Sequence, residues 1–77
     1  MNVVNYITAD RDVCHGKPCF KGTRIMASNV LELLEAGEST QEILEDCPSL
    51  TVEHIRAALH LASEFFGKGQ FFKIPAA

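Results

Sequence analysis

The sequence of 77 residues lacks several features that would place it in a broad class at once. It has no apolar run approaching the roughly 20 residues that cross a bilayer, and no basic N-terminus followed by a hydrophobic stretch. Its three cysteines are an odd number, which argues against a closed disulfide framework. We therefore expect a cytoplasmic protein that does not bind membranes.

Clusters of residues that could carry chemistry are also scarce. Cys14, His15 and Cys19 lie close together, but a structural zinc site needs four ligands, and only Cys47 or a distant histidine could complete it. Reduced, partly buried thiols are the better interpretation. In an extended segment Cys14 and His15 would point to opposite faces, and Gly16-Lys17 lacks the rest of a phosphate-binding loop. We expect no enzyme activity, no metal and no cofactor.

Positive charge is nearly absent from the middle of the chain. Residues 32–64 contain eight acidic residues against Arg56, a net charge of −7, whereas residues 1–31 and residues 65–77 each carry +2. Phosphate contacts dominate the affinity of proteins for DNA. A surface built from residues 32–64 is therefore a poor docking site for DNA.

What the chain does contain is an unusual run of glycine, proline and basic residues between His15 and Ile25. Gly16 and Gly22 permit a positive φ, and Pro18 fixes φ and removes an amide donor. The run therefore predicts a tight loop defined by its backbone, with Thr23 bonded locally across the turn.

The residues before this loop predict a short strand. Residues 3–7 are β-branched and aromatic, and one such strand is not stable alone. It must pair with Cys19-Phe20, with the stretch around Arg24-Ile25, or with the same strand of a second chain. We predict a homodimer joined through residues 3–7 or through the basic loop.

Three helices are expected after the loop. The first begins at Ser28 or Asn29, either of which can cap it, and ends before Gly37. The second begins with a capping box between Ser39 and Glu42 and cannot continue past Pro48.

The third helix has the clearest start. Thr51 caps it and Leu50 packs on Ile55 as a hydrophobic staple. Apolar residues then recur at helical spacing and should face inward: Ile55, Ala58, Leu59, Ala62, Phe65 and Phe66. Residues 1–77 would thus form a single domain, with a β-prone segment and loop (1–26), three helices (27–66) and an apolar tail (67–77).

The order of these motifs resembles a small bacterial family, domain of unknown function 433, over roughly residues 7–66. The motifs are His15-Gly16-Lys17-Pro18, Lys21-Gly22-Thr23-Arg24-Ile25, Gly37-x-Ser39 and Pro48-x-Leu50-Thr51. The resemblance implies a mainly α, three-helix helix-turn-helix domain with a small N-terminal β element. Genes of this family often lie beside genes for PIN-like nucleases, which implies an antitoxin that inhibits the nuclease by protein contact, with repression of its own operon as a further role.

The tail is the predicted partner-binding segment. Phe71, Phe72 and Ile74 are too apolar to be left in water, so they either fold back on the domain or bind a groove or sheet edge of a partner. Lys73 or Lys68 could neutralise carboxylates that hold a metal in a PIN-like site. The predicted partner-binding residues are Phe71, Phe72, Lys73 and Ile74.

The alternative function is a dimeric helix-turn-helix regulator that binds DNA; a third is a dimerising adaptor without nucleic acid. In a helix-turn-helix register the third helix would expose Glu53, Arg56, Ala57, His60 and Ser63, among which good base readers are few. For Arg24 a structural role, capping a helix or pairing with a carboxylate, is favoured. Candidate DNA contacts are Arg11, Lys17, Lys21, Arg24, Arg56 and His60.

Overall fold

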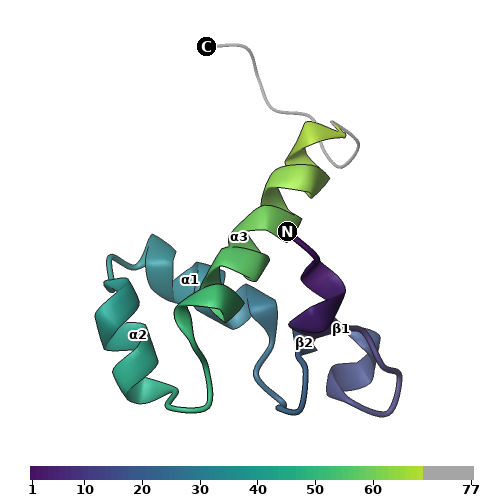
Figure 1. The fold of residues 1–77 in the computed structure, drawn as a ribbon, viewed down its shortest axis with the longest axis horizontal. Helices are drawn as coiled ribbons and strands as arrows, with labels where there is room; N and C mark the ends of the chain where they lie inside the picture. The colour runs from purple at the N-terminus through teal and green to yellow at the C-terminus, as the bar shows by residue number, and fades with distance from the viewer. Residues whose placement is uncertain (69–77) are drawn as a thin grey trace.

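The computed structural model describes residues 1–68, and these form a mainly helical domain (Figure 1). Its α-helices are α1 (Ala27–Glu35), α2 (Thr40–Asp46) and α3 (Val52–Gly67). Before them lie two strands, β1 (Ile7–Thr8) and β2 (Cys19–Phe20), and two 3₁₀ turns, η1 (Val3–Asn5) and η2 (Cys14–Gly16). The predicted fold class, three helices with a small N-terminal β element, is confirmed. Within residues 1–68 no helix is both long and apolar enough to cross a membrane.

The two strands form a small antiparallel sheet, with Ile7 opposite Phe20 and Thr8 opposite Cys19. The prediction of a strand over residues 3–7 was wrong for its first part. The amide of Tyr6 donates to the carbonyl of Val3 at 2.9 Å, which closes a 3₁₀ turn before the strand begins. Because β1 pairs with β2 of the same chain, the strand does not need a second chain, and the homodimer stays a prediction.

A hydrogen-bonded turn follows β2. The amide of Thr23 donates to the carbonyl of Phe20 at 3.0 Å, and Gly22 takes φ +78° at the third position, as a type II turn requires. The Thr23 hydroxyl donates to the same carbonyl at 2.8 Å and accepts from the amide of Ile25 at 3.0 Å. The predicted local role of Thr23 is confirmed, as is the positive φ of Gly16 and Gly22.

Helix α1 begins at Ala27, earlier than predicted. Its N-cap is Met26, which makes no side-chain capping bond. The amide of Ala27 instead donates to the carbonyl of Pro18 at 3.0 Å, so the N-terminal loop takes the place of a cap. The predicted end is confirmed, because Gly37 has φ +94° and the amide of Glu38 donates to Leu33 O at 3.1 Å.

The starts of α2 and α3 agree with the sequence signals. The amide of Glu42 donates to Ser39 Oγ at 3.1 Å and the amide of Ser39 donates to Glu42 Oε1 at 3.0 Å, which is the predicted capping box. Helix α3 begins at Val52, directly after Thr51. There the partner of the Thr51 amide is the ring of His54.

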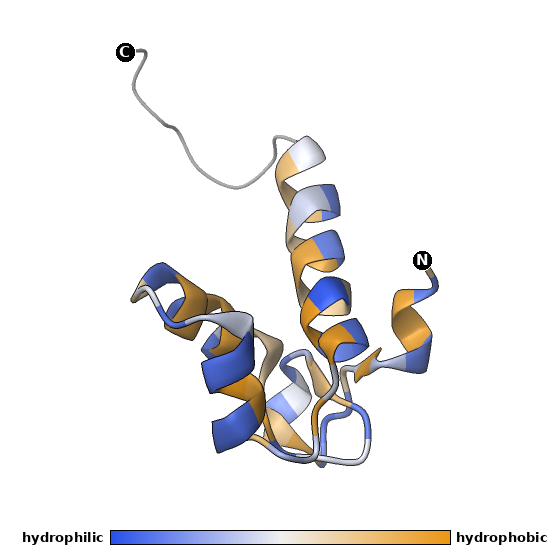
Figure 2. Ribbon diagram, turned by 60° about the vertical axis from the view of Figure 1, so that its left-hand side comes forward, coloured by the Kyte–Doolittle hydropathy of each residue, from blue (hydrophilic) through white to orange (hydrophobic). Residues whose placement is uncertain are grey.

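One core joins the sheet to the helices. Figure 2 shows hydrophobic residues on all three helices and on the strands. Phe20 and Ile43 are fully buried, and the His54 ring lies edge-on to Tyr6 (5.3 Å between ring centres) and to Phe20 (5.6 Å). The buried apolar residues come from the sheet and from the helical part of the chain: Ile7, Phe20, Ala27, Val30, Ile43, Leu50, Ile55, Ala57 and Ala58.

The inward face of α3 differs from the predicted one. Ala57, expected on the exposed face, is fully buried, whereas Leu59, expected inside, is 48% exposed. Phe65 and Phe66 are 56% and 60% exposed. The exposure of these two rings follows from the length of the helix, because the last turns of α3 extend beyond the body formed by α1 and α2 (Figure 1).

Candidate partner-binding groove

An apolar groove with a volume of about 440 Å³ lies between α1 and the C-terminal half of α3. Lys17 and Pro18 of the N-terminal loop complete its lining, and Lys17 is the only charged residue among those of residues 1–68 that line it. The helical walls are Ala27, Ser28 and Leu31 of α1 and Ala58, Leu61, Ala62, Phe65 and Phe66 of α3.

Small side chains and unequal helix lengths create this groove. Ala27 and Ala58 are both buried where α1 and α3 pack, and with Ala62 they leave space that larger side chains would fill. Helix α3 has 16 residues and α1 only 9, so the far end of α3 has no length of α1 beside it. Within residues 1–68 the result is an apolar surface on a helix, which is a common way to bind an apolar segment of a chain.

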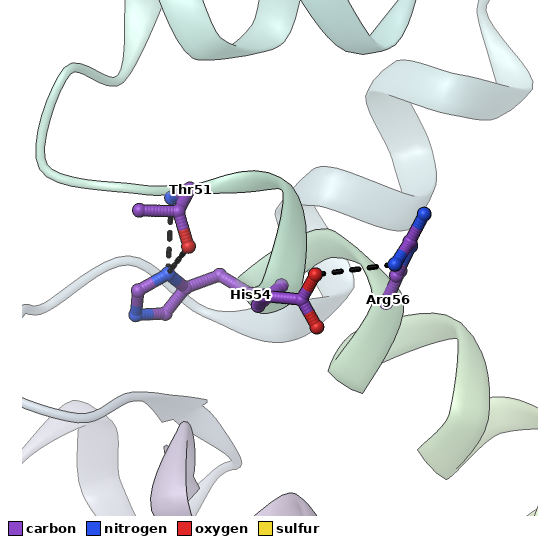
Figure 3. Close-up of polar contacts among 4 residues, drawn as sticks. Thr51, His54 and Arg56 are labelled. Atoms are coloured by element: carbon purple, nitrogen blue, oxygen red, sulfur yellow. Dashed lines mark hydrogen bonds and ion pairs between the residues drawn. The ribbon is translucent and has the colours of Figure 1, made fainter. Parts of the chain in front are cut away.

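The exposed side of α3 is occupied by acid–base pairs. Arg56 Nη1 lies 3.2 Å from Glu53 Oε1, a contact drawn as the dashed line at Arg56 in Figure 3. His60 Nε2 lies 3.1 Å from Glu64 Oε1. Arg56 and His60 are the two predicted DNA contacts on this helix. Each has a carboxylate beside it, so this side of α3 presents little uncompensated positive charge to a phosphate backbone.

The start of α3 is held by its histidine. The amide of Thr51 donates to His54 Nδ1 at 3.0 Å, and the Thr51 hydroxyl lies 2.9 Å from the same nitrogen (Figure 3). Since Nδ1 accepts from an amide, the neutral ring carries its proton on Nε2. His54 therefore has a structural role that joins α3 to Tyr6 and Phe20.

The four basic residues of the N-terminal region are exposed but line different surfaces. Lys17 lies at the groove, and Lys21 Nζ donates to the carbonyl of Val4 at 3.3 Å. Arg24 lines a separate hollow with Thr8 and Asp10, while Arg11 lies beside Asp10 in a third.

The structural role favoured for Arg24 is not found. Its guanidinium is exposed and makes no hydrogen bond or ion pair within the described part of the chain. Its backbone carbonyl is the group that bonds, accepting from Cys14 Sγ at 3.3 Å. The Gly22-Thr23 turn before it is held by the hydrogen bonds of Thr23 and by the amide of Phe20, which donates to the carbonyl of Ile25 at 2.9 Å.

We expected an extended segment around Cys14, but the structure has a turn there. Cys14 and His15 both lie in the left-handed region, with φ +52° and +56°. Burial, followed by a hydrogen bond with Cys14, raises the pKa of the Cys19 thiol. All three cysteines are free thiols, as predicted, but the close approach of Cys14 and Cys19 was missed. The available signal was the glycine and proline between them, which turn the chain back.

The groove was also missed, and its signal was the alanines at positions 58 and 62 of α3, one turn apart. The predicted turn residues Gly16, Pro18, Gly22 and Thr23 all lie in the N-terminal loop and turn described above. The predicted partner-binding residues Phe71, Phe72, Lys73 and Ile74 lie outside residues 1–68.

Comparison with known proteins gives the family of the chain without an activity. The "Uncharacterized protein y4eO" of Sinorhizobium fredii (strain NBRC 101917 / NGR234) is 38% identical over 52 residues, which cover 68% of this chain and 24% of that protein. The chain thus spans about a quarter of the length of this relative. No solved structure matches. A family model described as "Protein of unknown function (DUF433)" matches residues 7–62, most of the chain, which therefore belongs to the DUF433 family.

Proposed function

We propose that this domain is an antitoxin-type protein that neutralises a PIN-like nuclease by protein–protein contact. The observation that carries the proposal is the apolar groove that residues 1–68 form between α1 and α3. Exposed apolar grooves on small domains typically bind an apolar helix or strand of a partner. The nuclease as partner follows from the resemblance that the motifs of the loop and helices carry.

Charge supports the same partner. A nuclease holds a polyanionic substrate on a positively charged surface, and such a surface attracts an acidic protein. The helical region provides this acidic surface, because Glu32 and Glu35 of α1 and Glu42, Glu45 and Asp46 of α2 are all exposed. Opposite charges would orient the two proteins, and the apolar groove would supply the buried contact.

The residues that follow α3 add to the proposed surface. Phe71, Phe72 and Ile74 come next in sequence after the helix whose last turns line the groove. Buried aromatic anchors dominate the energy of most interfaces. Lys73, between them, is the proposed cation for the carboxylates of a nuclease active site.

The test is whether this protein inhibits RNA cleavage by a PIN-like nuclease, with both proteins purified at full length. Replacing Phe71, Phe72 and Ile74 together by alanine should weaken the complex by several kcal/mol and leave the helices folded. Ala62→Glu places a charge in the groove and should also abolish inhibition, whereas Ser63→Glu, on the next and exposed residue, should not.

Two outcomes would contradict the proposal. A chain truncated after Phe66 that still inhibits would remove the tail from the interface. Full inhibition by the folded Ala62→Glu variant would remove the groove.

A dimeric DNA-binding regulator is the second candidate, favoured by the exposed basic residues of the N-terminal region. It predicts that Arg24→Ala or Arg56→Ala lowers the affinity for operator DNA and reduces the salt slope by about one unit per lost phosphate contact. The regulator must also be a dimer at micromolar concentration in sedimentation. A monomer at that concentration would exclude this second candidate.

A further inference from the structure

The thiols of Cys14 and Cys19 meet at one peptide segment. Cys14 Sγ donates to the carbonyl of Arg24 at 3.3 Å, and Cys19 Sγ donates to the carbonyl of Thr23 at 3.7 Å. Two consecutive carbonyls of one segment thus receive the two thiols. Because Thr23 and Arg24 are adjacent in the chain, the two sulfurs that bond to their carbonyls lie in the same part of the loop.

The backbone of η2 produces this approach. Cys14, His15 and Gly16 have three consecutive positive φ angles, which turn the chain back before Lys17. The amide of Gly16 donates to the carbonyls of Asp10 (3.0 Å) and Val13 (3.2 Å), and the amide of Lys17 to that of Cys14 (3.0 Å). The turn is therefore fixed in the conformation that brings the Cys14 side chain to β2.

The two thiols differ in access. Cys14 is half-buried and reaches solvent, whereas Cys19 is fully buried in β2. This division matches the two roles in thiol oxidation by peroxide: an accessible thiol that is attacked first, and a neighbouring thiol that resolves the product.

We propose that Cys14 and Cys19 form a peroxide-responsive pair that closes into an intramolecular disulfide. The Cys14 thiolate attacks hydrogen peroxide, which breaks the O–O bond and gives Cys14 sulfenic acid and hydroxide. The Cys19 sulfur then attacks the sulfenic sulfur and releases water, its proton leaving with the hydroxyl group. In sum, two thiols and one hydrogen peroxide give one disulfide and two waters.

The disulfide acts on the surface already described. Lys17 and Pro18 lie between the two cysteines and line the apolar groove, and the carbonyl of Pro18 holds the amide of Ala27. Closing the bond removes both thiol–carbonyl hydrogen bonds and constrains this edge of the groove. An effect on partner binding rests on the proposed function; the disulfide itself does not.

The experiment oxidises the full-length Cys47→Ser variant with one equivalent of hydrogen peroxide and maps its peptides by mass spectrometry. The expected product is a monomer without alkylatable thiols, with Cys14 joined to Cys19, which dithiothreitol reverses. Disulfides between chains, or sulfinic acid at Cys14 beside a free Cys19, would overturn the proposal.

Two single variants separate the roles of the thiols. Cys19→Ala should accumulate Cys14 sulfenic acid that dimedone traps, and Cys14→Ala should leave Cys19 unmodified under the same treatment. If Cys19→Ala does not fold, Cys14→Ala alone tests the proposal, because Cys14 lies outside the core and its replacement should leave the fold intact. Oxidation of Cys19 at an unchanged rate in Cys14→Ala would exclude the proposal that Cys14 reacts with peroxide first. This result would hold whatever the nuclease assay shows.

Discussion

Residues 1–26 and residues 27–68 hold their backbones in different ways. The first region has only four residues in strands, and four of its residues, Cys14, His15, Gly16 and Gly22, have a positive φ. The second has three helices and a single positive φ, at Gly37. Turn hydrogen bonds together with bonds between more distant residues, such as Ala27 to Pro18, hold the first region, whereas bonds within each helix hold the second. Local sequence signals therefore describe the second region far better than the first.

The two regions nevertheless share one core. Phe20 of β2 is fully buried against residues of the helices, and His54 of α3 contacts the rings of Tyr6 and Phe20. A chain this short buries too little apolar surface for two independent cores. The predictions below separate what the regions share from what each holds alone.

The largest effect should come from Phe20→Ala, which removes the ring at the junction of the two regions. Truncation of a buried phenylalanine costs about 3–5 kcal/mol, a large part of the about 5–15 kcal/mol that stabilises a typical domain. Urea denaturation followed by circular dichroism should show one cooperative transition at much lower urea. Leu59→Ala, at a position 48% exposed, is the control and should cost about 1 kcal/mol or less. If the helices kept their wild-type midpoint in Phe20→Ala, the two regions would be separate folding units.

Two glycines test how far the first region depends on positive φ. Gly22→Ala should destabilise by about 1–2 kcal/mol, because an L-residue in the left-handed region is strained. Gly67→Ala, at the last residue of α3, should be neutral or stabilise by up to about 1 kcal/mol. Among residues 1–68 an added Cβ meets no atom within 4 Å at either position, so the two sites differ in their backbone conformation. Equal melting temperatures of the two variants would show that the turn does not need its glycine.

The parts of the fold that the sequence predicts are those with local causes. The box of Ser39 and Glu42 and the glycine after α1 act within a few residues, and both were found as predicted. The strand over residues 3–7 was wrong because β-propensity does not specify the partner or the register. Helix α1 started early because its first amide bonds to Pro18, which no local pattern reports.

The candidate site was less predictable than the fold. Its groove depends on how α1 and α3 pack, and periodicity placed Leu59 inside and Ala57 outside when the reverse holds. The C-terminal half of α3 has the apolar pattern of a buried helix but extends past the body, so burial could not be deduced from the pattern. The approach of Cys14 to Cys19 needs the left-handed turn of two non-glycine residues, which sequence propensity disfavours.

Capping residues sharpen the comparison at the helix starts. Ser39→Ala removes the hydroxyl that accepts from the amide of Glu42 and should cost about 1 kcal/mol. Ser28→Ala and Asn29→Ala should cost far less, because α1 starts before both and its first amide is held by Pro18. Urea midpoints of the three variants measure this directly. A cost at Ser28 or Asn29 equal to that at Ser39 would show that α1 has a local cap after all.

The smallest effect is a pH dependence that belongs to α2 alone. The hydrogen bond from the Ser39 amide, and then that of its hydroxyl, holds the pKa of Glu42 below its usual range. A carboxylate with a lowered pKa in the folded state stabilises the fold above its unfolded pKa, about 4.3, and loses this contribution as the pH falls through the folded value. Glu42→Gln keeps an oxygen that can accept from Ser39 but does not titrate. The stability difference between wild type and Glu42→Gln should therefore be largest at neutral pH and shrink in acid.

Two further variants complete this measurement. Ser39→Ala retains the amide donor, so it should keep a smaller version of the same pH dependence, because one of the two causes of the lowered pKa remains. Glu35→Gln, at an exposed position of α1, provides the matched control for loss of one negative charge. If Glu42→Gln and Glu35→Gln followed the same curve of unfolding free energy against pH, the effect would come from net charge and not from the capping box. Curves that separate only for Glu42→Gln would assign the pH dependence to a bond made within four residues, in the region whose structure local sequence determines.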